Sequence, residues 1–156
     1  MLSIEVEDDF SDKIDSTLIE RAVRLTFEHE AIPWEINSLT LVITDDNQIE
    51  SLNKKYLGIS APTDVLSFPT NYPDPDSGTI YLGDVLVSFP RAVAQAREAG
   101  HLVDQELQFL VVHGILHLLG HDHEKVDEGR KMWTAQAEIL DMLGVQIDLP
   151  LNFPDK

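Results

Sequence analysis

Residues 107–123 read LQFLVVHGILHLLGHDH, and this stretch decides how the rest of the chain must be arranged. Its first part predicts a helix that is apolar on nearly every side, so this helix must be buried against other elements. His113 and His117 are four residues apart, which places their rings on one face of the helix, one turn apart. Both imidazoles need partners there, because an unsatisfied buried polar group costs about 1–3 kcal/mol.

A metal ion shared with a third histidine would satisfy this pair. On a continued helix, His123 would point about 240° away from His117 and lie about 9 Å further along the axis. Gly120 can end the helix in the left-handed conformation and turn the chain back, so that His123 reaches the pair. Three neutral imidazoles with one open position are typical of catalytic zinc. We therefore predict one Zn²⁺ per chain, held by His113, His117 and His123.

The alternative to a metal site is a buried helix that carries histidines by chance, followed by a surface pair, His121 and His123. With zinc bound, the three ligands would act in catalysis through the metal-bound water, whose pKa falls from that of bulk water to about 7. On an RNA substrate, which the family resemblance below implies, either the hydroxide attacks the phosphodiester or the metal polarises a phosphoryl oxygen while a ribose 2′-hydroxyl attacks. The sequence leaves both routes open.

The histidine spacing also equals that of the zinc peptidase signature H-E-x-x-H-x-x-G-x-x-H. Gly114 stands where the peptidase has the glutamate that takes a proton from the metal-bound water. Glycine has no side chain that could accept a proton. A zinc metallopeptidase is therefore the disfavoured alternative function.

The remaining sequence predicts one α+β domain over residues 1–156, with a small mixed four-stranded sheet, about five to six helices and the zinc site at the end of the central buried helix. Ser16 is expected to cap the first long helix, and the turn-rich segment NYPDPDSG, residues 71–78, is expected to be a loop. We expect strands at residues 2–6, 39–44, 65–68 and 80–89, and helices at about residues 17–31, 47–58, 90–99, 104–119 and 124–143.

Composition limits the partners of this chain. Eleven Lys and Arg residues stand against 28 Asp and Glu residues, a net charge of −17, so the protein is no general binder of polyanions. Cysteine is absent, which excludes disulfides and thiolate metal sites. The first ten residues do not resemble a signal peptide, and the apolar stretch at residues 109–119 is too short to span a bilayer. We expect a soluble, cytoplasmic protein without a membrane partner.

Three blocks of the sequence resemble the YbeY family, the bacterial and plastid rRNA maturation factors. The blocks are HGILHLLGHDH at residues 113–123, PTDVLSFP at 62–69 and LGDV at 82–85, and the likeness covers about residues 35–145. The resemblance implies a zinc-dependent single-strand endoribonuclease that matures the 3′ end of small-subunit (16S) rRNA and acts in ribosome quality control. It also implies ribosomal RNA and small-subunit ribosomal proteins as partners, and no DNA.

One departure from the family concerns the segment LNKKYL, residues 52–57. The family usually has Arg where this chain has Leu57, and an Arg beside the metal would bind phosphate with two hydrogen bonds. Lys54 lies one helical turn earlier and is a candidate for a replacement charge in catalysis. The alternative is that Lys54 is solvated and takes no part.

Four further residues are candidates for the site. Asp64 and Asp84 lie at strand ends, where they either face the cleft or cap turns, and Asp84 is a candidate catalytic residue. Asp122 either holds the second nitrogen of a ligand imidazole or caps the end of a helix. His121 is expected to line the cleft around the metal and not to bind it.

The net charge also supports a different class of function. A protein this acidic is expected to bind naked RNA weakly and in a salt-sensitive manner. It would then act as a ribosome-assembly factor with little or no catalytic activity, docked through its acidic surface on basic ribosomal proteins.

Overall fold

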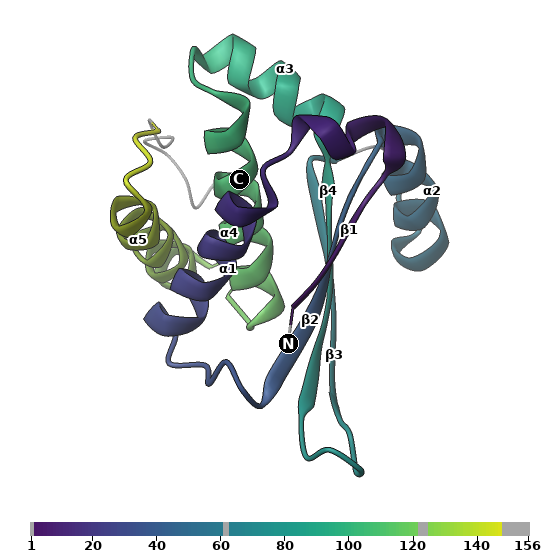
Figure 1. Cartoon of the computed structure of the whole chain (residues 1–156), viewed down its shortest axis with the longest axis vertical. Coiled ribbons are helices and arrows are strands. Elements are labelled where there is room, and N and C mark those ends of the chain that lie inside the picture. The colour runs from purple at the N-terminus through teal and green to yellow at the C-terminus, as the bar shows by residue number, and fades with distance from the viewer. Residues whose placement is uncertain (1, 61–62, 122–124, 148–156) are drawn as a thin grey trace.

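The computed structural model describes residues 2–60, 63–121 and 125–147. Its centre is a four-stranded sheet in the order β1-β2-β4-β3 (Figure 1). The strands β1 (Leu2–Val6), β2 (Asn37–Thr44) and β4 (Ile80–Ser88) are parallel to one another, whereas β3 (Val65–Pro73) runs antiparallel to β4. The expected mixed four-stranded sheet is therefore confirmed.

The helices cover the two faces of the sheet unequally. α2 (Asp46–Leu57) lies alone on one face, and the other helices lie on the opposite side (Figure 1). With the 3-10 helix η1 (Asp8–Lys13), the described residues form six helices, as expected. None of these helices is long and apolar enough to cross a lipid bilayer. The larger layer is built from α1 (Ser16–His29), α3 (Phe89–Ala99), α4 (Val103–Leu118) and α5 (Val126–Leu143).

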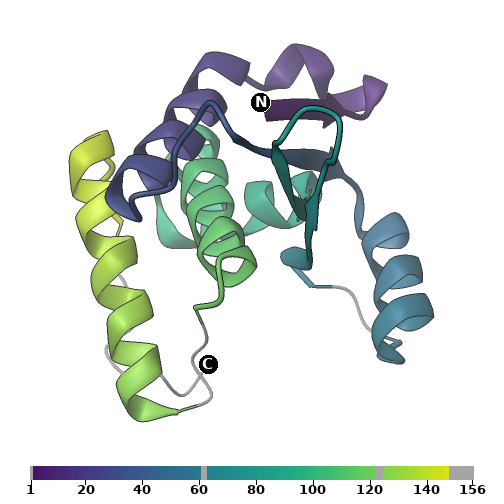
Figure 2. The same ribbon diagram turned by 90° about the horizontal axis from the view of Figure 1, so that it is seen from below.

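α4 occupies the middle of this layer, where it contacts α1, α3, α5 and the strands β3 and β4 (Figure 2). Its apolar side chains are almost completely buried, and with those of β2 and β4 they form the main core. Fully burying one such side chain stabilises the fold by about 1.5–3 kcal/mol. A smaller core of Ile49, Leu66 and Leu86 lies under α2.

Two local predictions are wrong. Asp15, not Ser16, caps α1, because its carboxylate accepts a hydrogen bond of 3.0 Å from the backbone N–H of Thr17. The predicted loop at residues 71–78 is partly a strand, since β3 continues to Pro73 and only the following residues turn. β3 is an edge strand, where a proline is tolerated because its missing N–H costs no ladder hydrogen bond.

Candidate active site

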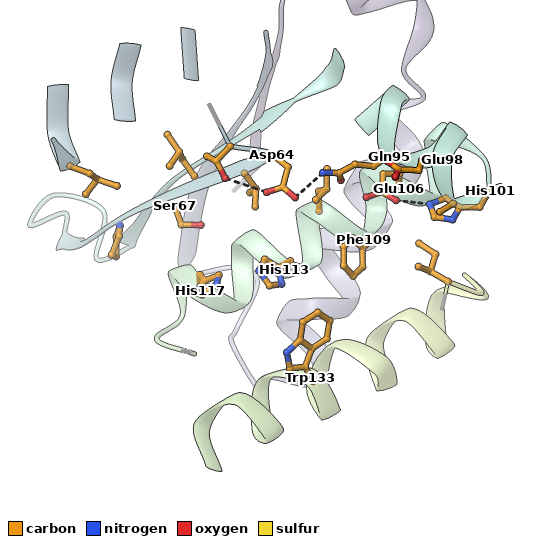
Figure 3. A pocket seen from close by; sticks show the side chains of 18 residues that line it. Asp64, Ser67, Gln95, Glu98, His101, Glu106, Phe109, His113, His117 and Trp133 are labelled. Carbon is orange, nitrogen blue, oxygen red and sulfur yellow. Dashed lines mark hydrogen bonds and ion pairs between the residues drawn. The ribbon is translucent and has the colours of Figure 1, made fainter. Parts of the chain in front are cut away.

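A cavity of about 910 Å³ follows one face of α4 and is closed by β3, α3 and α5 (Figure 3). Glu106, Phe109, His113 and His117 line it from α4, each about one helical turn from the next. The face that carries the two histidines is therefore the face that α4 turns toward this cavity. The opposite walls carry Asp64, Ser67, Gln95 and Trp133.

The two histidine rings of α4 lie next to each other, as the sequence predicts. Their centroids are 4.8 Å apart, and the ring planes are inclined by 80°. Both side chains are half-buried and line the cavity. Trp133 and Phe109 flank the ring of His113, with centroids at 5.9 and 6.1 Å. The pair thus lies in a partly apolar recess that limits the access of water.

Gln136 on α5 determines which nitrogen of His113 carries the proton. Its Nε2 donates to the carbonyl oxygen of Phe109 at 3.3 Å, which orients Oε1 toward His113. Oε1 lies 2.9 Å from Nδ1 of His113 and can only accept, so Nδ1 carries the hydrogen. The lone pair is then on Nε2, the nitrogen that a metal would take. A partner of this kind is typical of metal-binding histidines.

Gly114, between the two histidines, lets α4 approach the sheet closely. A Cβ atom at this position would lie 2.6 Å from Cγ1 of Val85 and 2.8 Å from Cγ2 of Val65. At the same point, Ser67 Oγ donates a 2.7 Å hydrogen bond to the carbonyl oxygen of Gly114. No side chain fits between α4 and the sheet here, so the glutamate of a peptidase has no room at position 114.

The end of the cavity away from His117 is acidic. Asp64 accepts a 3.3 Å hydrogen bond from Gln95, and Glu106 accepts one of 2.5 Å from His101 (Figure 3). Burial raises the pKa of Glu106; His101 opposes this effect and the charge of Asp64 adds to it. The acidic side chains at this end, Asp64, Glu98 and Glu106, therefore outnumber His101, and a phosphate group is better placed near the histidine pair.

His121 lies apart from this cavity, although the sequence places it in the cleft. Its Nε2 is 2.5 Å from Oε1 of Glu30, the residue that follows α1. His121 lines a second, smaller hollow with Lys131 and Glu128. It therefore links the end of α4 to the end of α1.

Asp84 and Lys54 are not brought to the cavity. The carboxylate of Asp84 accepts a hydrogen bond from the hydroxyl of Tyr81, a neighbour on the same strand. Lys54 is exposed on α2 and does not contribute to the cavity wall. Leu57 does line the cavity, so a side chain at this position faces the site, and Asp64 lines it as well.

His123 and Asp122 lie outside the described residues. Within residues 2–60, 63–121 and 125–147, no three His, Asp or Glu side chains lie together in a way that could hold a metal ion. This part of the chain supplies two adjacent imidazoles, one of them with its tautomer set. A three-ligand site needs one more donor, and the donor set then suits zinc.

Sequence reasoning missed Gln136, Glu106 and His101. Glu106 lies seven residues before His113, so helical spacing alone places both on one face. Gln136 gave no such signal, because it is on another helix, 23 residues further along the chain. His101 reaches the cavity through its contact with Glu106 and has no metal-ligand spacing to His113.

Comparison with known proteins gives one consistent result. A family model described as "Endoribonuclease YbeY" matches residues 3–144. A curated protein of that name from Roseiflexus castenholzii is 42% identical, with 93% of this chain and 94% of the relative covered. One from Chloroflexus aurantiacus is also 42% identical, with 92% and 96% covered. A solution structure from Thermotoga maritima superposes with a TM-score of 0.61 at 26% identity, covering 92% of this chain and 89% of that one.

Proposed function

The chain belongs to the YbeY endoribonuclease family, and on this premise we propose that it is a zinc-dependent endoribonuclease that cleaves single-stranded RNA. We propose further that its substrate is the 3′ end of small-subunit (16S) rRNA, and that it acts in the cytoplasm, in rRNA maturation and ribosome quality control. The observation that carries the proposal is the adjacent pair His113 and His117 in the cavity, with Gln136 orienting the first ring.

His113, His117 and His123 would hold the metal. When bound, zinc supplies Lewis acidity and lowers the pKa of a water molecule to about 7. His113 offers Nε2, because Gln136 keeps the hydrogen on Nδ1. Phe109 and Trp133 limit access of water to this ring, and a lower local dielectric strengthens electrostatic interactions there.

The cavity also suggests how RNA is placed. A volume of about 910 Å³ lies in the range of small-molecule pockets, which is room for a few nucleotides of a single strand. The acidic side chains Asp64, Glu98 and Glu106 make one end unfavourable for phosphate, so the scissile phosphate is directed toward His113 and His117. Leu57 offers no positive charge at the wall, so the metal itself has to supply much of the attraction for phosphate.

The experiment that tests this proposal combines metal content with cleavage. Zinc stoichiometry is measured for the wild type, His117→Ala and His101→Ala, the last a histidine at the far end of the same cavity. Cleavage of a structured rRNA fragment is then followed with and without a chelator. We expect about one zinc per chain and chelator-sensitive cleavage for the wild type and His101→Ala, and neither for His117→Ala. Equal cleavage by folded His117→Ala would contradict the proposal.

The net charge of −17 favours a second candidate, an assembly factor that docks on basic ribosomal proteins with little catalytic activity. His117→Ala also distinguishes this candidate from the endoribonuclease. A factor of this kind would bind small ribosomal subunits equally well as wild type or as His117→Ala, and the variant would still support maturation of the subunit in cells.

A zinc peptidase receives no support from the packing at Gly114, because the position of its glutamate is closed by Val65 and Val85. Casein hydrolysis that a chelator inhibits would restore this alternative. We expect no such hydrolysis.

A further inference from the structure

Glu30 and its neighbour His29 together join three separate segments of the chain through hydrogen bonds. Its Oε1 lies 2.5 Å from Nε2 of His121, beyond the end of α4. Its Oε2 lies 2.7 Å from Nδ1 of His29, the last residue of α1. His29 Nε2 in turn lies 3.1 Å from Glu138 Oε1 on α5. The carboxylate of Glu30 therefore accepts from two imidazoles and links the ends of α1 and α4, and His29 extends this link to α5.

His121 is the first residue beyond the turn that ends the histidine helix. Gly120 has φ +103°, and its N–H donates to the carbonyl oxygen of His117 at 3.0 Å. The N–H of His121 donates to the carbonyl oxygen of Leu116 at 2.9 Å. The backbone of the turn is thus attached to the helix end that carries His117, and the side chain of His121 is attached to Glu30.

The contact between Glu30 and His121 is sheltered. The two side chains are 16% and 21% exposed. Burial acts to raise the pKa of Glu30, but the hydrogen bonds from His121 and His29 outweigh it and lower the pKa. Glu30 therefore stays a carboxylate with two accepting oxygens. Hydrogen bonds to a charged acceptor of this kind are stronger than those between neutral groups.

We propose that Glu30 is a positioning residue for the metal site, which acts by fixing the turn after α4 through His121. The inference rests on the proposed function, because it assumes a metal on His113 and His117. The third expected ligand, His123, follows His121 by two residues in the sequence. A turn that is held before the metal arrives does not have to be ordered on binding, and this preorganisation increases affinity.

The Glu30 cluster is not itself a second metal site. His121 and His29 each direct a ring nitrogen at a different oxygen of Glu30, so the groups form a chain and do not converge. In the described part of the protein, no three such side chains are arranged to hold a metal. The Glu30 cluster therefore contributes to the position of the turn after α4 and does not bind a metal itself.

The test compares Glu30→Gln with Glu28→Gln. Both variants remove one negative charge, at positions two residues apart in the sequence. The side chain of Glu28 is exposed, and the hydrogen bond at Glu28 is accepted by its backbone carbonyl oxygen. The amide at position 30 has one accepting oxygen where the carboxylate has two. The zinc dissociation constant is measured on the full chain by competition with a chromophoric chelator, and the thermal midpoint of the metal-free protein is measured beside it.

We expect Glu30→Gln to bind zinc about 2- to 10-fold more weakly, which is the cost of ordering about one further side chain on binding, and Glu28→Gln to bind as the wild type does. His121→Gln removes the same contact from the other side. The double variant should then bind zinc as tightly as whichever single variant binds zinc less tightly, since both changes remove the same interaction. A purely structural role would lower the thermal midpoint and leave zinc affinity unchanged.

The outcomes separate this inference from the proposed function. Wild-type affinity in Glu30→Gln, together with loss of zinc in His117→Ala, would overturn the role of Glu30 and leave the metal site standing. Additive losses in the double variant would also overturn it, because the two residues would then act independently. A wild-type protein that binds no zinc would overturn both.

Discussion

Gln136 on α5 accepts a 2.9 Å hydrogen bond from Nδ1 of His113 on α4. Two consecutive helices thus combine to present one imidazole nitrogen to the cavity. Gln136 is completely buried, and its own amide group is held by the backbone of α4 at Phe109. The orientation of His113 is therefore set in advance by Gln136, a side chain that does not line the cavity itself.

Gln136→Leu should weaken zinc binding by about 10- to 100-fold, because Nδ1 of His113 loses its acceptor and the ring loses its fixed tautomer. The side chains are similar in size, so the metal-free fold should persist, which far-UV circular dichroism checks. Zinc affinity is measured by chelator competition. Unchanged affinity in a folded variant would show that the hydrogen bond does not matter to the site.

Gly114→Ala should destabilise the protein by about 1–3 kcal/mol, since its Cβ would overlap the methyl groups of Val85 and Val65. The direction of the change in stability is informative, because replacing Gly by Ala inside an exposed helix stabilises a protein by about 0.5–1 kcal/mol. Urea unfolding gives the free energy. Adding Val85→Ala should recover part of the loss, and a Gly114→Ala protein as stable as the wild type would contradict the close packing.

Leu57→Arg should increase the affinity for single-stranded RNA, because position 57 lines the cavity and a guanidinium there can bind phosphate. One added phosphate contact steepens the dependence of log affinity on log salt by about 0.7 for a single strand. Fluorescence anisotropy at several salt concentrations measures this slope. Ile59→Arg adds the same charge at an exposed position outside the cavity wall, and an equal effect there would indicate general attraction only.

Lys54→Glu should leave the rate of RNA cleavage within about twofold of the wild type, because the exposed Lys54 does not line the cavity and exposed charges are screened by salt. Initial cleavage rates on the rRNA fragment measure this. A loss of several-fold would place Lys54 on the RNA and support it as the replacement for the missing family Arg.

His29 should make the stability of the metal-free protein depend on pH. Partial burial acts to lower the pKa of His29, but hydrogen bonds to Glu138 and Glu30 outweigh it, so the pKa is raised above 6.5. A raised pKa means that the native state binds the proton more tightly. The stabilisation is complete below about pH 6.5 and is lost as the pH rises through the pKa of the folded protein.

His29→Gln should therefore reduce the free energy of unfolding more at about pH 5.5 than at about pH 8.5. Urea unfolding at both pH values, with chelator present, gives the comparison. An equal reduction at the two pH values would mean that the charge of His29 contributes nothing.

The histidine pair was predictable because it depends on local rules. A helix that is apolar on nearly all sides must be buried, and residues four apart share a face, so α4 and the adjacency of His113 and His117 follow from the sequence. The sheet and its helices follow in the same way from residue periodicity. Where two capping residues are neighbours, as at Asp15 and Ser16, local preference does not choose between them.

The features that the sequence did not reveal depend on contacts between distant segments. Gln136 meets His113 only because α5 packs against α4, and His121 meets Glu30 across 91 positions of the chain. The requirement for glycine at position 114 arises from valines on two strands. β3 extends beyond its predicted end because pairing with β4 outweighs the turn preference of its residues.

The central place of α4 has a consequence for how the site is lost. Because α1, α3, α5 and the sheet all pack on this helix, the amide hydrogens around His113 and His117 are expected to exchange with solvent only through global opening of the protein. The exposed β3–β4 hairpin end can fray without disturbing them. The pair of His113 and His117 should thus persist through partial openings and disappear only when the whole molecule unfolds.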